Sequence, residues 1–105
     1  MNAKDFVELF HNEKQDLLEE YFSKNSQTEV KKLITSLNLN DEQYRILFKV
    51  LDTSLTDAFY TILLGLDGAV SIGGKQYLYD IRDEKGKQIS SGDIEAYAYE
   101  YFHSK

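Results

Sequence analysis

Hydrophobic residues recur at helical spacing throughout residues 41–68, and the rest of the chain is expected to pack around this stretch. When the residues are placed at about 100° steps around a helix, one broad face collects most of the large side chains. That face comprises Tyr44, Leu47, Phe48, Leu51, Leu55, Ala58, Phe59, Ile62 and Leu66. The opposite side carries a second apolar set, Ile46, Val50, Tyr60 and Leu64. The pattern therefore predicts a long central helix that is covered on two sides.

Two shorter helices are predicted before the central one. Residues 2–22 place apolar side chains on one face and acidic side chains on the other, which is typical of a surface helix. Ser26 and Glu29 form an S-x-x-E capping box, so a second helix is expected to start near Gln27. An N-x-x-Q box that begins at Asn40 marks the start of the central helix in the same way.

After Gly68 the spacing of apolar residues changes from the helical period to an alternation typical of β-strands. Gly73 and Gly74 form a two-residue hairpin turn, and a further turn lies near residues 83–86. The segment is therefore expected to form a three-stranded antiparallel meander. Ser90 or Ser91 is then expected to cap a C-terminal helix.

These elements and the chain length define the predicted fold. A chain of 105 residues fits one domain, and such a chain buries roughly 65 % of its unfolded surface in a single core. We therefore expect one α+β domain over residues 1–105. It consists of three N-terminal helices with a long central helix, a three-stranded antiparallel meander and a C-terminal helix.

Two charged residues interrupt apolar faces and need partners. Lys14 projects from the middle of the apolar face of the first helix, and Asp57 lies within the second apolar face of the central helix. A charge in such a place is paired, hydrogen-bonded or at the mouth of a wet cleft. If the first helix packs on that second face, Lys14 and Asp57 form a buried charge pair; otherwise Lys14 snorkels to water and Asp57 uses nearby hydroxyl groups. Asp52 lies beside Lys49 and Arg45 and is expected to form a surface ion pair.

The composition excludes several classes of function. Eighteen acidic and twelve basic residues give a net charge of −6, which disfavours a general nucleic-acid binder because such proteins need cationic contacts to phosphates. There is no cysteine, hence no thiolate nucleophile or thiolate metal site, and a cytoplasmic location is expected. No apolar run is long enough for a signal peptide or a membrane span. No metal or cofactor is predicted, and His11 and His103 are expected on exposed helix faces.

The acidic face of the first helix is the main candidate for a binding surface. Its carboxylates include Asp5, Glu8, Asp16 and Glu19, with no lysine or arginine among them. Tyr99 points away from the apolar face of the last helix and is the aromatic residue best placed for a contact. This arrangement favours a protein partner of basic character.

The order of elements over residues 41–105 resembles that of small acidic uncharacterised bacterial proteins, some of them of toxin-immunity type. The resemblance lies in the FYTILLGLDGAVSI junction, with Leu66-Asp67-Gly68 as its near-motif. It carries over no functional residue. It implies a non-enzymatic binding module that masks a basic partner protein. The alternatives are a homo-oligomeric accessory protein and a small hydrolase that uses Asp57.

Overall fold

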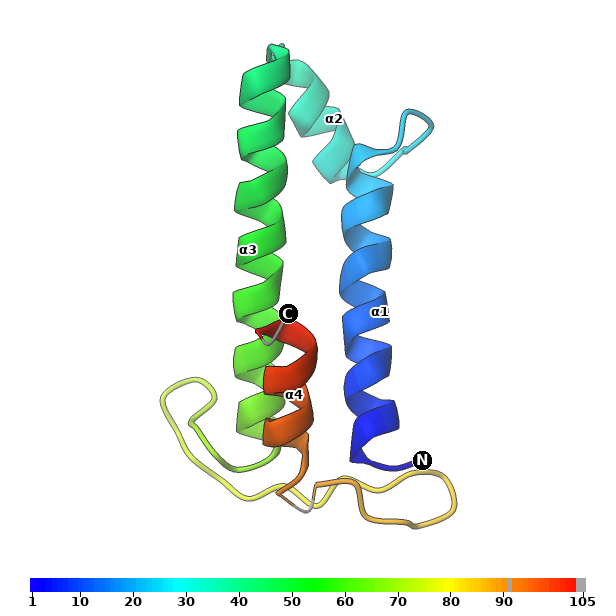
Figure 1. Ribbon diagram of the computed structural model, residues 1–105, viewed down its shortest axis with the longest axis vertical. Coiled ribbons are helices and arrows are strands. Elements are labelled where there is room, and N and C mark those ends of the chain that lie inside the picture. The colour runs from blue at the N-terminus through cyan, green and yellow to red at the C-terminus, as the bar shows by residue number, and fades with distance from the viewer. Residues whose placement is uncertain (91, 104–105) are drawn as a thin grey trace.

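The computed structural model describes residues 1–90 and 92–103, and these form an elongated helical molecule of 47 × 28 × 26 Å. Its helices are α1 (Ala3–Phe22), α2 (Glu29–Ser36), α3 (Asp41–Leu66) and α4 (Ile94–Phe102). The long helices α1 and α3 run antiparallel, and the short α2 links them at one end (Figure 1). The short α4 packs beside both long helices at the other end.

Local hydrogen bonds explain where the helices begin. The predicted capping box of α3 is confirmed: the Gln43 amide donates to Asn40 Oδ1 at 2.8 Å, and the Asn40 amide donates to Gln43 Oε1 at 3.0 Å. The helix α2 starts two residues later than predicted, because Thr28 and not Ser26 is its N-cap. The Thr28 hydroxyl accepts from the Lys31 amide at 3.1 Å, which satisfies a free donor of the first turn.

The main core lies where α1, α3 and α4 meet. Its buried members are Ala3, Val7, Leu63, Ile89, Ile94, Ala98 and Phe102. Leu63 is fully buried although the helical wheel did not place it on the core face. Ile62 and Phe48, which the wheel did place there, are 44 % and 41 % exposed. The expected two-sided cover of α3 is therefore wrong over much of its length, because α4 reaches only the C-terminal part of the helix.

The predicted three-stranded meander is also wrong, and with it the α+β class. Within residues 1–90 and 92–103 the structure contains isolated β-bridges, Ile72 with Lys75 and Arg82 with Gln88, and no sheet. The turn at Gly73 and Gly74 does form, since both glycines have positive φ angles of 63° and 82°. The paired segments around it do not extend, because a short hairpin has little stability of its own without a further strand or a packed face.

Side-chain packing fixes this loop to the end of α3 instead of to a neighbouring strand. A Cβ atom at Gly65 would lie 2.3 Å from Ile72 Cγ1, so only glycine leaves room for that side chain. A Cβ atom at Gly68 would lie 2.7 Å from Leu78 Cδ2, and its φ angle of +80° also favours glycine. The two glycines at the end of α3 therefore leave the space in which the loop packs against the helix.

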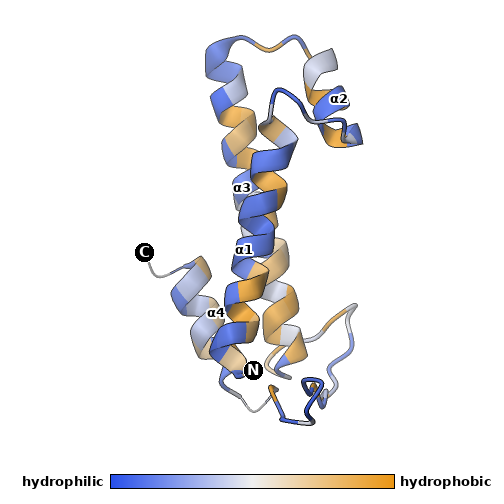
Figure 2. Cartoon of the chain, turned by 90° about the vertical axis from the view of Figure 1, so that its right-hand side faces the viewer, coloured by the Kyte–Doolittle hydropathy of each residue, from blue (hydrophilic) through white to orange (hydrophobic). Residues whose placement is uncertain are grey.

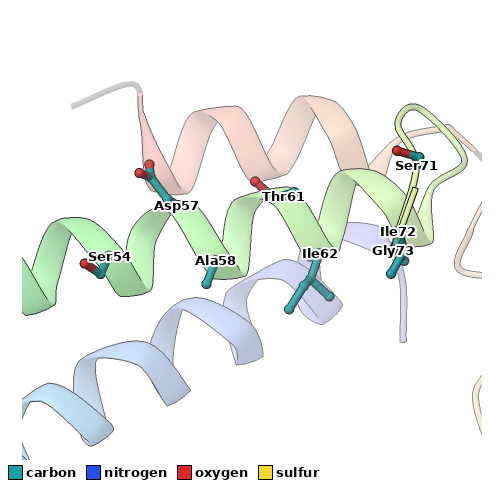
Figure 3. A pocket seen from close by; sticks show the side chains of 8 residues that line it. All are labelled: Ser54, Asp57, Ala58, Thr61, Ile62, Ser71, Ile72 and Gly73. Carbon is teal, nitrogen blue, oxygen red and sulfur yellow. The ribbon is translucent and has the colours of Figure 1, made fainter. Parts of the chain in front are cut away.

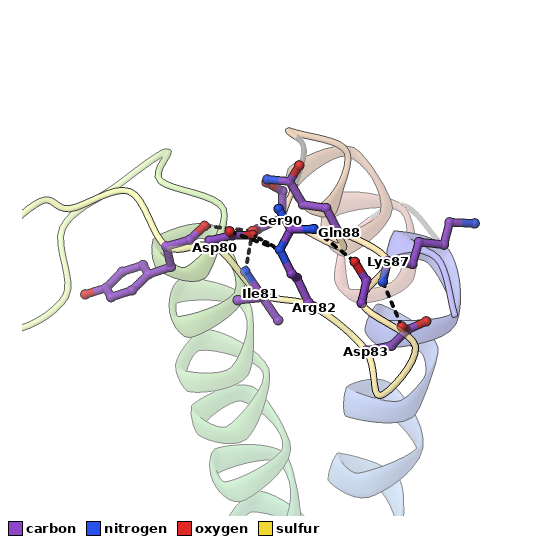
Figure 4. Close-up of polar contacts among 9 residues, drawn as sticks. Asp80, Ile81, Arg82, Asp83, Lys87, Gln88 and Ser90 are labelled. Atoms are coloured by element: carbon purple, nitrogen blue, oxygen red, sulfur yellow. Dashed lines mark hydrogen bonds and ion pairs between the residues drawn. The ribbon is translucent and has the colours of Figure 1, made fainter.

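Side chains supplement the backbone bonds of the second hairpin, in which the Asp83 amide donates to the Lys87 carbonyl at 3.0 Å and the Ile89 amide to the Ile81 carbonyl at 2.7 Å (Figure 4). The Ser90 hydroxyl donates to the Tyr79 carbonyl at 2.7 Å and accepts from the Ile81 amide at 2.8 Å. Asp83 Oδ1 accepts from the amides of Lys85 and Lys87. The pKa of Asp83 is lowered mainly by the α-amino group of Met1, which lies 3.0 Å from Asp83 Oδ2. The hydrogen bond from the Lys87 amide lowers this pKa further. These bonds satisfy the backbone locally without a sheet.

The helix α4 is capped by a residue distant in sequence. Asp67, which directly follows α3, accepts from the Gly92 amide through Oδ1 and from the Glu95 amide through Oδ2, both at 3.0 Å. The expected cap at Ser90 or Ser91 is not confirmed: the Ser90 hydroxyl serves the loop, and Ser91 lies outside the described residues. One carboxylate therefore joins the end of α3 to the start of α4 and places its negative charge at the positive end of the helix dipole.

Replacing Asp67 by alanine should lower the free energy of unfolding by about 1–2 kcal/mol, the usual cost of losing an N-cap side chain. Urea denaturation would measure the loss. The matched control is Asp16→Ala, which removes an exposed carboxylate from α1 and should change stability by less than about 0.5 kcal/mol. Equal losses for the two variants would contradict the capping role.

Candidate functional site

The two long helices are held together more loosely away from α4. There Phe22 of α1 stacks on Tyr44 and Phe48 of α3, with ring centroids 5.3 and 5.0 Å apart. The Lys31 ammonium of α2 donates to the Tyr44 hydroxyl at 3.2 Å. Phe48 nevertheless stays 41 % exposed. This end of the molecule therefore presents an aromatic side chain to solvent between its helices.

Two neighbouring open grooves share Glu19, and we call them together the acidic groove. One part of it lies between α1 and α3 and is lined by Gln15, Leu18, Glu19 and Phe48. The other part follows the end of α1 into the next loop and is lined by Asp16, Glu19, Glu20, Ser23, Asn25, Ser26 and Gln27. Glu19 belongs to both parts. The C-terminal half of α1, which carries these residues, is largely hydrophilic in Figure 2.

The carboxylates of the acidic groove lack internal partners. Among the described residues, the side-chain carboxylates of Asp16, Glu19 and Glu20 take part in no hydrogen bond or ion pair, and all three residues are exposed. The last turn of α1 contains no basic residue. Negative charge at a helix C-terminus is unfavourable by about 0.3–1 kcal/mol per group, because the helix dipole already places negative charge there. A cation bound in the acidic groove would relieve this repulsion.

The other predicted contact residues lie at the core end of the molecule. Asp5 closes the capping box of α1, accepting from the Asn2 amide at 3.2 Å. Glu8 Oε2 accepts from the Tyr101 hydroxyl at 3.0 Å, and this bond raises the pKa of Tyr101. Tyr99 is 55 % exposed on α4, near the His103 ring. The structure therefore brings together Asp16 and Glu19 but places Asp5, Glu8 and Tyr99 elsewhere.

Lys14 is buried as its position on the wheel suggested, but its partner is Asp52. Lys14 is 7 % exposed, and its Nζ lies 2.5 Å from Asp52 Oδ1. The contact is an ion pair without the angles of a hydrogen bond. The predicted pair with Asp57 is wrong, because Asp52 and Asp57 lie about 140° apart around α3 and only Asp52 faces α1. The expected ion pair of Asp52 with Lys49 or Arg45 is corrected by the same contact.

Asp57 instead lies in a separate open groove on the outer side of α3 (Figure 3). The groove is lined by Ser54, Asp57, Ala58, Thr61, Ile62, Ser71, Ile72 and Gly73. Its lining offers hydroxyl groups but no second ionisable side chain that would act as a base, an acid or an ion-pair partner. The geometry therefore adds no catalytic constellation around Asp57.

The two histidines take part in packing between helices. His11 is half-buried, and its ring lies 5.7 Å from that of Tyr101 and 5.4 Å from that of Phe102. His103 is exposed and meets Tyr60 edge-on at 4.4 Å. The expected exposure of His11 is wrong, because α4 covers this face of α1 and the wheel of one helix cannot show a neighbour that is distant in sequence.

Neither a metal centre nor a membrane span is found in the described part of the chain. Residues 1–90 and 92–103 contain no group of three or more histidine, cysteine, aspartate or glutamate side chains arranged to hold a metal ion. None of their helices is long and apolar enough to cross a bilayer. No protein-family model, curated protein or solved structure matches the chain. The surfaces of the chain itself are therefore the only guide to its function.

The buried ammonium predicts an asymmetric double-mutant cycle. Asp52→Asn leaves Lys14 charged and buried and should cost about 1–3 kcal/mol of unfolding free energy. Lys14→Met leaves a carboxylate whose side chain is 41 % exposed, so we expect a loss within about 1 kcal/mol. The double variant should lose less than the sum of the two. Denaturation of the control Asp57→Asn should show a change below about 0.5 kcal/mol, and a loss as large as that of Asp52→Asn would contradict the assignment.

Proposed function

We propose that this chain is a non-enzymatic protein-binding module whose acidic groove masks a basic segment of a partner protein, in the manner of an immunity protein. The observation that carries the proposal is the position of exposed Phe48 beside the unpartnered carboxylates of Asp16, Glu19 and Glu20. This combination pairs an aromatic anchor with a charged rim.

Protein interfaces commonly have an apolar centre and a polar rim, and a few buried aromatic side chains carry much of the binding energy. Phe48 supplies the exposed apolar centre of the acidic groove, beside the buried Leu18. Glu19 lies at the boundary between this centre and the acidic loop part. A partner segment that fits both parts has apolar residues on one side and lysine or arginine on the other, as an amphipathic basic helix does.

The charge of the whole chain supports the same class of partner. A net charge of −6 attracts cationic proteins at long range and increases their association rate. The partner is therefore a basic protein and not a nucleic acid. We place the module in the cytoplasm, because a chain without cysteine draws no stability from an oxidising compartment.

The hydrolase alternative receives no comparable support. The groove that contains Asp57 is lined by apolar groups and hydroxyl groups, and its one ionisable residue is Asp57 itself. A hydrolytic reaction needs a nucleophile together with a base or a metal ion that activates it. The described surfaces thus favour binding over catalysis.

Charge reversal in the acidic groove should weaken capture of the partner. The full chain, immobilised, would be exposed to lysate of its source, and bound proteins identified and ranked by isoelectric point. We expect basic proteins that are released as salt rises, since screening acts over about 8–10 Å at ordinary ionic strength. Glu19→Lys and Phe48→Ala should each reduce binding of the captured protein by about tenfold or more.

The matched control is Glu100→Lys, which changes the net charge by the same amount at an exposed position of α4. It should retain binding within about threefold, because a distant rim charge acts only through long-range attraction. Captured proteins that are neither basic nor sensitive to salt would contradict the proposal. Equal losses for Glu19→Lys and Glu100→Lys would contradict the assignment of the acidic groove.

A further inference from the structure

Exposed residues at four-residue spacing form a continuous row along α3, which turns by about 160° around the helix axis from its first residue to its last. We call it the outer row, and it consists of Ile46, Val50, Ser54, Ala58 and Ile62. Ile46, Val50 and Ile62 are 58 %, 50 % and 44 % exposed. The row spans about 24 Å of helix at a rise of about 1.5 Å per residue. Two open grooves run along it and share Ser54 as a common lining residue.

The outer row has nearly the same sequence of side-chain sizes in both directions. Isoleucine stands at each end, Val50 and Ala58 lie inside, and the small Ser54 is at the centre. A two-fold axis through Ser54 would pair Ile46 with Ile62 and Val50 with Ala58 of a second copy. Rows at four-residue spacing interlock in the commonest helix packing, with axes crossing at about −50°. A small central residue lets the two backbones approach closely at the crossing.

The neighbouring row on α3 adds charge complementarity to this symmetry. It contains Arg45, Lys49, Thr53, Asp57 and Thr61, with basic residues toward one end and the acidic residue toward the other. Among the described residues, the side chains of Lys49 and Asp57 take part in no ion pair or hydrogen bond. In an antiparallel pair of α3 helices, the basic end of this row in one copy runs beside the acidic end of the row in the other. A parallel pair would place like charges together, which is unfavourable.

The shape of the molecule leaves surface to spare for such a contact. The accessible surface is 7260 Å², whereas a folded monomer of this mass exposes about 6,060 Å². The radius of gyration is 16.3 Å, against about 13 Å for a compact domain of this length. The excess of about 1,200 Å² exceeds the roughly 800 Å² that each partner buries in a standard interface.

We propose that the outer row is the contact surface of a homodimer, in which a second copy packs its own α3 antiparallel across Ser54. The interface is isologous, since the same residues contribute from both copies. It lies on the side of α3 opposite the acidic groove, so a dimer keeps two acidic grooves open. The dimer can therefore be tested independently of the proposed function.

Sedimentation equilibrium of the full chain tests the dimer. We expect a mass twice the 12.2 kDa of one chain at micromolar concentration. Ser54→Arg places a long charged side chain at the crossing point and should raise the dimer dissociation constant by at least about 30-fold. Ser54 is exposed, so the variant should keep the circular dichroism spectrum of the parent. The matched control Asn12→Arg, on exposed α1, should remain dimeric.

The absence of native cysteine allows the orientation to be tested directly. After mixing and mild oxidation, Val50→Cys and Ala58→Cys chains should cross-link to one another, because the two-fold axis pairs these positions, whereas neither should cross-link readily to itself. A chain that stays at 12.2 kDa up to about 1 mM would overturn the dimer. A dimer unaffected by Ser54→Arg would overturn the outer row, and one in which Val50→Cys cross-links mainly to itself would overturn the antiparallel arrangement. Ser54→Arg should also capture the basic partner as the parent does, which separates this inference from the acidic groove.

Discussion

Burial of the apolar side of α4 between α1 and α3 is the interaction on which the rest of the structure depends. A helix of nine residues has little stability alone in water, so α4 persists through packing and through its cap at Asp67. In turn, Ile94, Ala98 and Phe102 cover Val7 and Leu63 and complete the core. The loop before α4 needs no sheet for this, because its hydrogen bonds are made locally and Gly65 and Gly68 seat it against α3.

The same constraint explains where the exposed apolar side chains lie. Because α4 covers only one end of the helical hairpin, the other end keeps exposed apolar side chains that a third packed helix would have buried. Phe48 is exposed in the acidic groove, and Ile46 and Val50 are exposed on the outer side of α3. Each of the two proposed binding faces is therefore exposed without any rearrangement of the core.

The helices could be predicted from the sequence, because helical spacing is a local signal, and the capping box at Asn40 forms as expected. The start of α2 was predicted two residues too early. The place of Lys14 on an apolar face left burial and snorkelling to water both open, and the structure shows that it is buried. Its partner could not be predicted, since helix wheels do not give the side on which two helices approach. The meander was wrong because alternating residues and a glycine turn describe local conformation, whereas strand pairing depends on what else packs there. The cap from Asp67, distant in sequence from α4, left no local signal.

One end of the molecule is tightly packed and the other is open, and native-state hydrogen exchange would measure this difference. In the Ser54→Arg chain, amides of α4 and of residues 3–10 and 59–66 should exchange only with global unfolding, because they surround the core. Amides of α2 and of residues 45–50 should exchange through local opening at a free energy lower by about 2 kcal/mol or more. Uniform protection along α3, or faster exchange in α4 than in α2, would contradict the account.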